Sequence, residues 1–587
     1  MKFTTIINSL FVCFMFSGLN NQPHAYEQGT HQLLSELAVE RSVLINTDFI
    51  SSLGLSPYGS NAISYHGSSN NRKTIQELIS QGAYDEDENI NGSSVLFHFY
   101  DPQTLNKGSR GLRVGDVQFK NSMEWALEDN PKYSYQDVQE HFYAGLVAPI
   151  EQYRNVAFGD LFTAIGHVIH HVQDMAQPQH TRNEAHCPAW VCEKIEQYYA
   201  GQNIDTASLF ESYTADNSAD VRDIVANDSS YPLAYSFDLA ADFWQEEAAE
   251  GLLYMDSGMA TFSSTRFVTR NRNFSVDATG QIIAPQEFPM PTGQELSMTP
   301  NVGPCQIAGN QGAVNGICKH WSALITDKIR RPINKYIEKY VAESITNFSQ
   351  INANTPRNFV VDIASFEEHW QVLLPRAVSF SAGFINHIFR GQIGLSQDPA
   401  VPSLWYIHNA GNSPMSGSFK FLYDAYGYRA AVQTYNRFIP PGSYAAINVA
   451  EIPEAANKVI VAFSGDIGEE AGVAGVVMPY SAPARAIPCG GSISPAGGIE
   501  GLKQIVELGD NPGVVHLSFN AFNIPDSLTV STIGSGEILY STGGKVSNTV
   551  AGNFYFDAAV QGSSSVQVKV VGGDTKTKWQ LKLSCPG

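Results

Sequence analysis

Apolar residues recur with helical spacing through the first two thirds of the chain, from Tyr26 to about Gly391. Positions three or four residues apart share one face of an α-helix, so such runs predict amphipathic helices. The clearest runs are Leu33-Leu34-Leu37-Ala38, Phe158-Leu161-Phe162-Ile165 and Ile325-Ile329-Ile333-Ile337. A last helix is expected from Phe366 to Arg390, with Gly391 as its C-cap. These runs predict an all-α N-terminal domain.

Beyond residue 397 the pattern changes to short β-branched and aromatic runs separated by Gly, Pro and Asn. Five such runs predict strands: 458–463, 473–478, 514–519, 565–570 and 579–583. The last three alternate apolar and polar residues, which is typical of a small antiparallel sandwich. At 587 residues the chain is also too long for one core. We therefore expect a multidomain protein with an all-α domain (26–396), a β-rich domain (397–485) and a β-sandwich-like domain (486–587).

The first 25 residues have the composition of a secretory signal peptide. Lys2 precedes an apolar run from Ile6 to Leu19, and a small residue, Ala25, ends the segment. The apolar run is too short for a membrane anchor and is followed by polar residues. We expect cleavage after Ala25, a mature chain that begins at Tyr26, and secretion into the extracellular space or periplasm.

The cysteines support export. One of the seven, Cys13, would leave with the signal peptide, and an even number in an exported chain indicates three disulfides. Pairing within each domain gives the preferred set: Cys187 with Cys192, Cys305 with Cys318, and Cys489 with Cys585. Other connectivities remain open from sequence alone.

The charge of the chain bears on its partners. The formal net charge is −21, and such an acidic surface repels phosphate backbones. No basic footprint of the kind expected for nucleic-acid binding is evident, so nucleic acid is a disfavoured partner. Nothing in the sequence implies an obligate protein partner.

Histidines gather at one predicted helix end, in the segment from His167 to His180. His170 and Asp174 are four residues apart, so on a helix they lie on one face, close enough to share a metal ion. Pro178 ends the helix and leaves His180 free to fold back. A His-x3-Asp pair alone also fits an ordinary hydrogen bond.

Three residues further upstream strengthen the metal hypothesis: His31, Asp87 and His98, the last within His98-Phe-Tyr-Asp-Pro102. Imidazole and carboxylate ligands in this mixture suit zinc. Asp85 is a rival of Asp87 for this role, whereas Glu86 is expected to be solvated.

Over about residues 26 to 200, these motifs resemble the zinc-dependent phospholipase C and single-strand nuclease superfamily, in the same order along the chain. The resemblance implies an all-α, zinc phospholipase C-like catalytic domain and up to three zinc ions. It assigns the ligands in three groups: Asp87, His98, His170 and Asp174; His180, His186 and Glu196; and His31 with the backbone of Tyr26, Asp174 bridging to the first group. Asp87 would also position or deprotonate the attacking water.

Two departures from the family pattern concern the ligands. The family typically begins its mature chain with tryptophan where this chain has Tyr26, although the chelating atoms there are backbone atoms. The family also closes its second site with His-x3-Glu, whereas Cys192 stands four residues before Glu196. Either Cys192 is a ligand, or His186 supplies the imidazole while Cys192 pairs with Cys187; the second reading leaves no odd thiol.

Other histidines are assigned to structure. His167 lies one turn before His170 and fits a core position or one beside a ligand. His171 points about 100° away from His170 on the helix. Remote histidines have no partners at ligand spacing: His369, His387, His408 and His516.

The resemblance predicts a secreted zinc-dependent phosphodiesterase, a phospholipase C that hydrolyses glycerophospholipids to diacylglycerol and a phosphorylated head group. Phosphatidylcholine is the default substrate, and a phospholipid membrane surface is therefore the expected partner. Phe99 and Tyr100 could face a choline group through cation–π contact or pack in the core. Two alternatives remain: a single-strand nuclease with 3′-nucleotidase activity on the same fold, and a non-catalytic surface-binding protein with structural zinc.

Overall fold

The protein is described by a computed structural model, and the description covers the following residues: 28–56, 63–64, 72–87, 94–102, 111–114, 117–182, 184, 209–245, 258–269, 300–309, 312–327, 333–344, 359–398, 401–449, 452–453, 455–480, 487–493, 502–533, 535–572 and 578–587. The expected signal peptide lies outside them. So do five residues of the expected site and disulfides: Tyr26, His186, Cys187, Cys192 and Glu196. The chain forms two compact units, one of Met1–Glu451 with Lys458–Pro479 and one of Ile452–Asn457 with Tyr480–Gly587.

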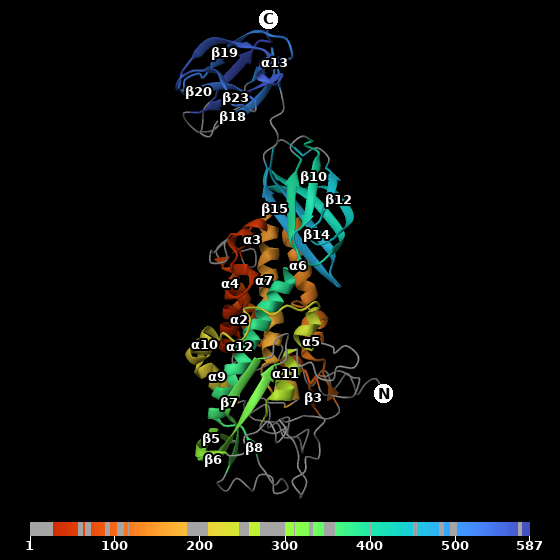
Figure 1. The fold of residues 1–587 in the computed structure, drawn as a ribbon, viewed down its shortest axis with the longest axis vertical. Coiled ribbons are helices and arrows are strands. Elements are labelled where there is room, and N and C mark those ends of the chain that lie inside the picture. Colours follow the sequence, from red (N-terminus) through yellow and green to blue (C-terminus); the bar gives the residue numbers. More distant parts are fainter. Residues whose placement is uncertain are drawn as a thin grey trace, which may run out of the picture. The chain divides into compact units, whose positions relative to one another are not determined.

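A bundle of long helices forms the body of the first unit. Its central helix, α7 (Glu151–Asp174), packs against α2 (Gln28–Glu40), α4 (Ile75–Asp85), α6 (Tyr135–Val147) and α12 (Ile363–Ile388) (Figure 1). The helices expected around Leu33–Ala38, around Phe158–Ile165 and from Phe366 to Arg390 are therefore present, as α2, α7 and α12. From residue 161 onward every residue of α7 is buried, as expected for a helix surrounded by others.

Helices α4 and α7 cross at very close range because each has a glycine at the contact. A Cβ atom on Gly82 would lie 2.1 Å from the carbonyl oxygen of Thr163. A Cβ atom on Gly166 would likewise lie 2.1 Å from the carbonyl oxygen of Ile79. No side chain fits at these distances, so the two glycines let the backbones touch. The contact sets the C-terminal end of α4 against the last turns of α7.

Shorter elements complete the helical body. They are α3 (Thr47–Ser52), α5 (Ser122–Glu124), α9 (Leu209–Asp216), α10 (Ser218–Asn227) and α11 (Met259–Arg266), the 3-10 turn η5 (His180–Arg182), and two small hairpins, β1 (Ile63–Ser64) with β2 (Arg72–Lys73) and β3 (Arg113–Val114) with β4 (Val117–Gln118).

An antiparallel sheet replaces one of the expected helices. Its strands run in the order β5 (Asn301–Gly309), β6 (Gly312–Asp327), β7 (Ile333–Ser344) and β8 (Phe359–Val360). The expected Cys305–Cys318 disulfide joins β5 to β6. The fold-class expectation of an all-α domain over residues 26–396 is therefore wrong: this part of the chain combines helices with antiparallel sheet.

The error has a simple physical cause in the isoleucine run. Residues four apart share a face of a helix, but four is also a multiple of the two-residue period of a strand. Within β7, Ile333 and Ile337 accordingly both pack against the core, as does Ile325 of β6, while Leu324 and Tyr336, paired across the two strands, are 51% and 65% exposed. β-Branched residues favour the strand when both patterns fit.

Two further sheets belong to the first unit. Their strand orders are β13-β10-β9 and β12-β11-β14-β15, with bounds β9 Ile393–Gln397, β10 Leu404–Asn409, β11 Met415–Ala425, β12 Tyr428–Ile439, β13 Tyr444–Asn448, β14 Ala456–Ile467 and β15 Glu470–Pro479. Side chains of these strands, including Leu422, Ile460 and Val473, share one core with the helices. His387 of α12 also pairs with Glu470 of β15 at 2.7 Å.

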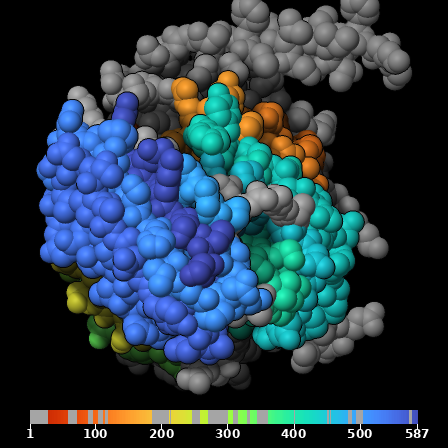
Figure 2. Space-filling view, turned by 90° about the horizontal axis from the view of Figure 1, so that it is seen from above, coloured from red at the N-terminus to blue at the C-terminus, as the bar shows by residue number. Residues whose placement is uncertain are grey.

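The second unit is a small β-sandwich, coloured blue in Figure 2. Its sheets have the orders β16-β18-β23-β20-β21 and β17-β24-β19-β22, with bounds β16 Ile487–Pro488, β17 Ser492–Ile493, β18 Leu502–Glu507, β19 Gly513–Asn520, β20 Ser527–Thr532, β21 Ile538–Ser541, β22 Thr549–Phe556, β23 Ser565–Val571 and β24 Gln580–Leu583; a short helix, α13 (Ala558–Gln561), precedes β23. Alternate residues of β19 and β23, such as Leu517 and Val568, point into one apolar core. The expected Cys489–Cys585 disulfide is present.

The five strands expected beyond residue 397 are all found, as β14, β15, β19, β23 and β24. Within the described parts of the chain, no helix has both the length and the apolar character needed to cross a membrane.

Candidate metal centre

The last turns of α7 carry polar side chains into the core of the helical body. His167, His170, His171 and Asp174 are at most 4% exposed. Burial of such groups is costly unless each has a partner, so their surroundings decide what they do. The helix ends at Asp174, before Pro178, and the η5 turn brings His180 back beside it, as the sequence predicted.

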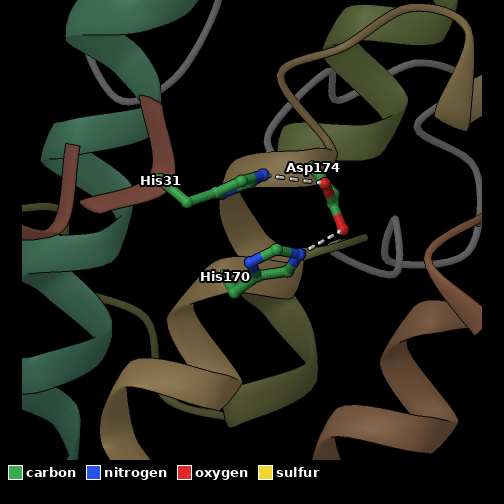
Figure 3. A group of neighbouring side chains, drawn as sticks. All are labelled: His31, His170 and Asp174. Carbon is green, nitrogen blue, oxygen red and sulfur yellow. Dashed lines mark ion pairs between the residues drawn. The ribbon is translucent and has the colours of Figure 1, made fainter. Parts of the chain in front are cut away.

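Asp174 lies in the middle of the cluster, with histidines close to both of its carboxylate oxygens. Its Oδ1 lies 3.4 Å from His31 Nε2, and its Oδ2 lies 3.3 Å from His170 Nε2 (Figure 3). Oδ2 is also 3.2 Å from His98 Nδ1. Oδ1 is 3.5 Å from His180 Nδ1, but that nitrogen donates its hydrogen to the carbonyl oxygen of His98 at 3.1 Å and is not a ligand atom. Two ligand atoms bound to one tetrahedral zinc ion at about 2.1 Å lie about 3.4 Å apart. The spacing is therefore that of ligands around a cation.

Asp87 adds a second carboxylate to the same space. One of its oxygens lies 3.6 Å from both His98 Nδ1 and His170 Nε2. Neither oxygen of Asp87 or of Asp174 accepts a well-directed hydrogen bond from any described residue. Four such buried acceptor atoms need a positive charge among them.

The tautomers of two histidines point to the same need. His170 donates its Nδ1 hydrogen to the carbonyl oxygen of Ala83 at 2.7 Å, and His31 donates its Nδ1 hydrogen to Gln173 Oε1 at 2.8 Å. A neutral ring in this state directs the lone pair of Nε2 at the Asp174 carboxylate. Lone pairs and carboxylate oxygens at these distances are compatible only with a cation or a proton between them. Such fixed outer contacts are typical of metal-ligating histidines.

Burial and charge set the protonation of the centre. Burial raises the pKa of Asp87 well above its ordinary value, and the neighbouring carboxylates Asp174, Glu211 and Glu86 raise it further. Burial also raises the pKa of Asp174, but His170, His98 and His180 outweigh it and hold that pKa well below the usual range. Burial lowers the pKa of both His98 and His170. A lowered pKa favours the neutral imidazole, which is the form that binds a metal ion.

Six of the nine sequence-predicted ligands thus converge: His31, Asp87, His98, His170, Asp174 and His180. The other three, Tyr26, His186 and Glu196, lie outside the described residues. The rival Asp85 is half-buried and accepts a hydrogen bond from Gln81 instead.

Two carboxylates near the centre were not foreseen. Glu211 of α9 lies 3.5 Å from His180 Nε2, on the side of the ring away from Asp174. Glu86, expected to be solvated, is only 4% exposed and pairs with His167 and His171. The one sequence signal for Glu211 is its position directly after Leu209-Phe210, on the face of α9 that also carries the buried Thr214.

The aromatic residues after His98 belong to the core. Phe99 and Tyr100 are 4% and 2% exposed, and the ring of Phe99 stacks on His180 with 4.6 Å between centroids. They support the ligands rather than offering a surface to a head group. The side chains of three of the remote histidines, His369, His387 and His408, have local partners; His369 Nε2, for example, donates to the carbonyl oxygen of Tyr340 at 2.9 Å.

No family model matches the chain, and no curated protein does. Among solved structures, a β-glucuronidase from Bacteroides uniformis is 8% identical over 31% of this chain and 27% of its own, with a TM-score of 0.12. An exo-chitosanase from Amycolatopsis orientalis is 12% identical over 35% and 27%, with a TM-score of 0.13. An insecticidal delta-endotoxin from Bacillus thuringiensis is 9% identical over 33% and 52%, with a TM-score of 0.11. The chain spans about a quarter to a half of their lengths, and these likenesses carry no argument.

The only guide to the kind of site is therefore the arrangement of its side chains, which is that of a candidate metal centre. Among the described residues, three buried groups of histidine and carboxylate side chains could hold metal ions: His31, His170 and Asp174; Asp87, His98 and His170; and Glu86, His98 and His171.

Proposed function

We propose that the protein is a secreted zinc-dependent phosphodiesterase of the phospholipase C type, acting on glycerophospholipids such as phosphatidylcholine at a membrane surface. The observation that carries the proposal is the pair of buried carboxylates, Asp87 and Asp174, surrounded by imidazole nitrogens at ligand spacing. Mixed nitrogen and oxygen ligands suit zinc, and such sets leave coordination positions open for water and substrate.

The described residues divide into three candidate zinc positions. Asp87, His98, His170 and Asp174 would hold one ion, and His31 with Asp174 a second. His180 and Glu211 would contribute to a third. Bound zinc ions neutralise a phosphodiester and lower the pKa of a bound water. The centre fits these ions because none of the four oxygens of Asp87 and Asp174 accepts a hydrogen bond from a described residue.

The residues of the chain have separate tasks in this proposal. Asp174 lies between His31 and His170 and keeps both imidazoles at fixed distances. Asp87 faces the same space from the end of α4 and is the candidate for orienting the attacking water. Two disulfides support the secreted location, because such bonds persist in oxidising compartments.

The test is phosphocholine release from phosphatidylcholine vesicles, measured on the full protein before chelation, after chelation and after zinc is restored. Hydrolysis of single-stranded DNA is measured in parallel, and Asp85→Asn serves as a carboxylate control outside the centre. We expect zinc-dependent lipid cleavage in the wild type and in the control. Zinc-dependent cleavage of DNA alone would replace the proposal with a nuclease, and inactivity on both substrates would reject a phosphodiesterase of either kind.

A further inference from the structure

Glu86 is a buried carboxylate next to the proposed ligands. The proposed function assigns it no role. Four donors surround it: His167 Nδ1 at 2.5 Å, His171 Nε2 at 3.1 Å, Trp125 Nε1 at 3.2 Å and Asn130 Nδ2 at 3.4 Å. These hydrogen bonds reach both oxygens of the carboxylate and hold it in one orientation.

His98 stands between Glu86 and the centre. Its Nδ1 faces Asp174 at 3.2 Å and Asp87 at 3.6 Å, while its Nε2 faces Glu86 Oε1 at 4.0 Å. No described residue makes a hydrogen bond with this Nε2, although the ring is completely buried. The two nitrogens of one ring thus point at two different sets of carboxylates.

We propose that Glu86 is a positioning residue of the metal centre. Its carboxylate keeps the hydrogen of His98 on Nε2, which leaves the lone pair of Nδ1 for the ion that Asp87 and Asp174 bind. A carboxylate that accepts the outer hydrogen of a ligating histidine fixes the tautomer and the ring orientation, and its loss costs metal affinity. The proposal rests on the metal centre of the proposed function and not on its substrate.

The geometry argues against a second possibility, that Glu86 binds a further metal ion together with His98 and His171. Both nitrogens of His171 are already engaged, Nε2 with Glu86 at 3.1 Å and Nδ1 with Ser122 Oγ at 3.3 Å. Glu86 itself takes hydrogen bonds on both of its oxygens. A cation there would have to displace these contacts, whereas a hydrogen on His98 Nε2 needs only a small movement of the ring.

The first experiment compares Glu86→Gln with the wild type in the full protein. Zinc affinity is measured by competition with a chelating dye, and the ligand field by the visible spectrum of the cobalt(II) form. The matched control is Asp85→Asn, one residue away and bonded to Gln81. We expect zinc binding about 10- to 100-fold weaker and an altered cobalt spectrum in Glu86→Gln, with the control unchanged.

Wild-type affinity and spectrum in a folded Glu86→Gln would overturn the role of Glu86 alone, whereas a wild type that binds no metal would overturn the metal centre as well. The second measurement needs no variant. In a crystal of the zinc-loaded wild type, anomalous scattering should place an ion about 2.1 Å from His98 Nδ1. An ion between His98 Nε2, Glu86 and His171 would contradict the proposal.

Discussion

At the scale of single residues, Asp174 decides the properties of the centre, because nitrogens of His31, His98 and His170 lie 3.2 to 3.4 Å from its two oxygens. Asp174→Asn keeps the size of the side chain but removes its charge and one acceptor atom. We expect metal affinity to fall by more than about 100-fold, beyond the usual effect of removing an outer contact. The proposed phosphodiesterase turnover should disappear with it. Metal content after dialysis checks this prediction, with Asp85→Asn as control, and full metal content in the variant would contradict it.

His369 gives the protein a pH-dependent stability away from the centre. Burial lowers its pKa from 6.5 to about 4, with Arg182 adding to the effect and the Tyr340 carbonyl and Asp362 opposing it. Below pH 6.5 the unfolded chain binds a proton here that the folded protein excludes. The free energy of unfolding should therefore decrease as the pH falls from about 6.5 to about 4, by at most about 3 kcal/mol from this residue.

The measurement is denaturant unfolding across that pH range in the wild type and in His369→Gln. The variant should show a shallower loss of stability, because glutamine does not titrate. Identical slopes in the two proteins would show that His369 is protonated or exposed in the folded state.

Ligands with a local sequence signal can be predicted, and ligands without one cannot. The four-residue spacing of His170 and Asp174 is enough to place both on one face of a helix. Glu211 reaches His180 only through the packing of α9, which no spacing along the chain reveals. Glu86 neighbours other carboxylates, which favours a solvated position, yet its partners, His167 and His171, lie on a helix about 80 residues further along.

At the scale of elements, the crossing of α4 and α7 positions the candidate metal ligands. Gly166→Ala would place a Cβ atom against the backbone of Ile79 and Ala83. Overpacking of this kind costs typically about 1–3 kcal/mol. Because Ala83 accepts the hydrogen bond of His170, we also expect weaker metal binding from the displaced α4.

Gly29→Ala is the matched control, since a Cβ atom at this exposed position of α2 would have no neighbour within 4 Å and alanine favours the helix. Thermal unfolding and zinc affinity are measured for both variants. Unchanged zinc affinity in a clearly destabilised Gly166→Ala would mean that the crossing serves stability alone.

Elements with one clear periodicity can be predicted from the sequence, and ambiguous ones cannot. The runs of α2 and α7 repeat apolar residues three as well as four positions apart, which fits a helix and not the two-residue period of a strand, and both helices are found where they were expected. Ile333 and Ile337, four apart within β7, fit both periods, and the sheet is decided by pairing between β6 and β7, which is a non-local property. In the strands of the second unit, apolar and polar residues alternate with a period of two, and this pattern does not fit a helix.

At the scale of the whole molecule, the second unit should be stabilised by its own disulfide. The Cys489–Cys585 bond closes a loop with a sequence separation of 96 residues. Removal of both cysteines by alanine should lower the free energy of unfolding of this unit by about 2–4 kcal/mol. The two units have separate cores, so the metal centre should be unaffected.

Calorimetry of the double variant checks this expectation, with zinc affinity measured on the same sample. A lower unfolding temperature for one transition, together with wild-type zinc affinity, is the expected result. A matching loss of zinc affinity would show that the two units are energetically coupled.

The same disulfide determines how the sandwich responds to a pulling force. Cys489 lies near the entry of the chain into this unit, and Cys585 comes shortly after the last strand, β24. Tension applied across the unit therefore passes from one sulfur to the other and bypasses the strands between them. The sandwich can be stretched from outside without being unravelled, and it would lose this mechanical protection in a reducing environment.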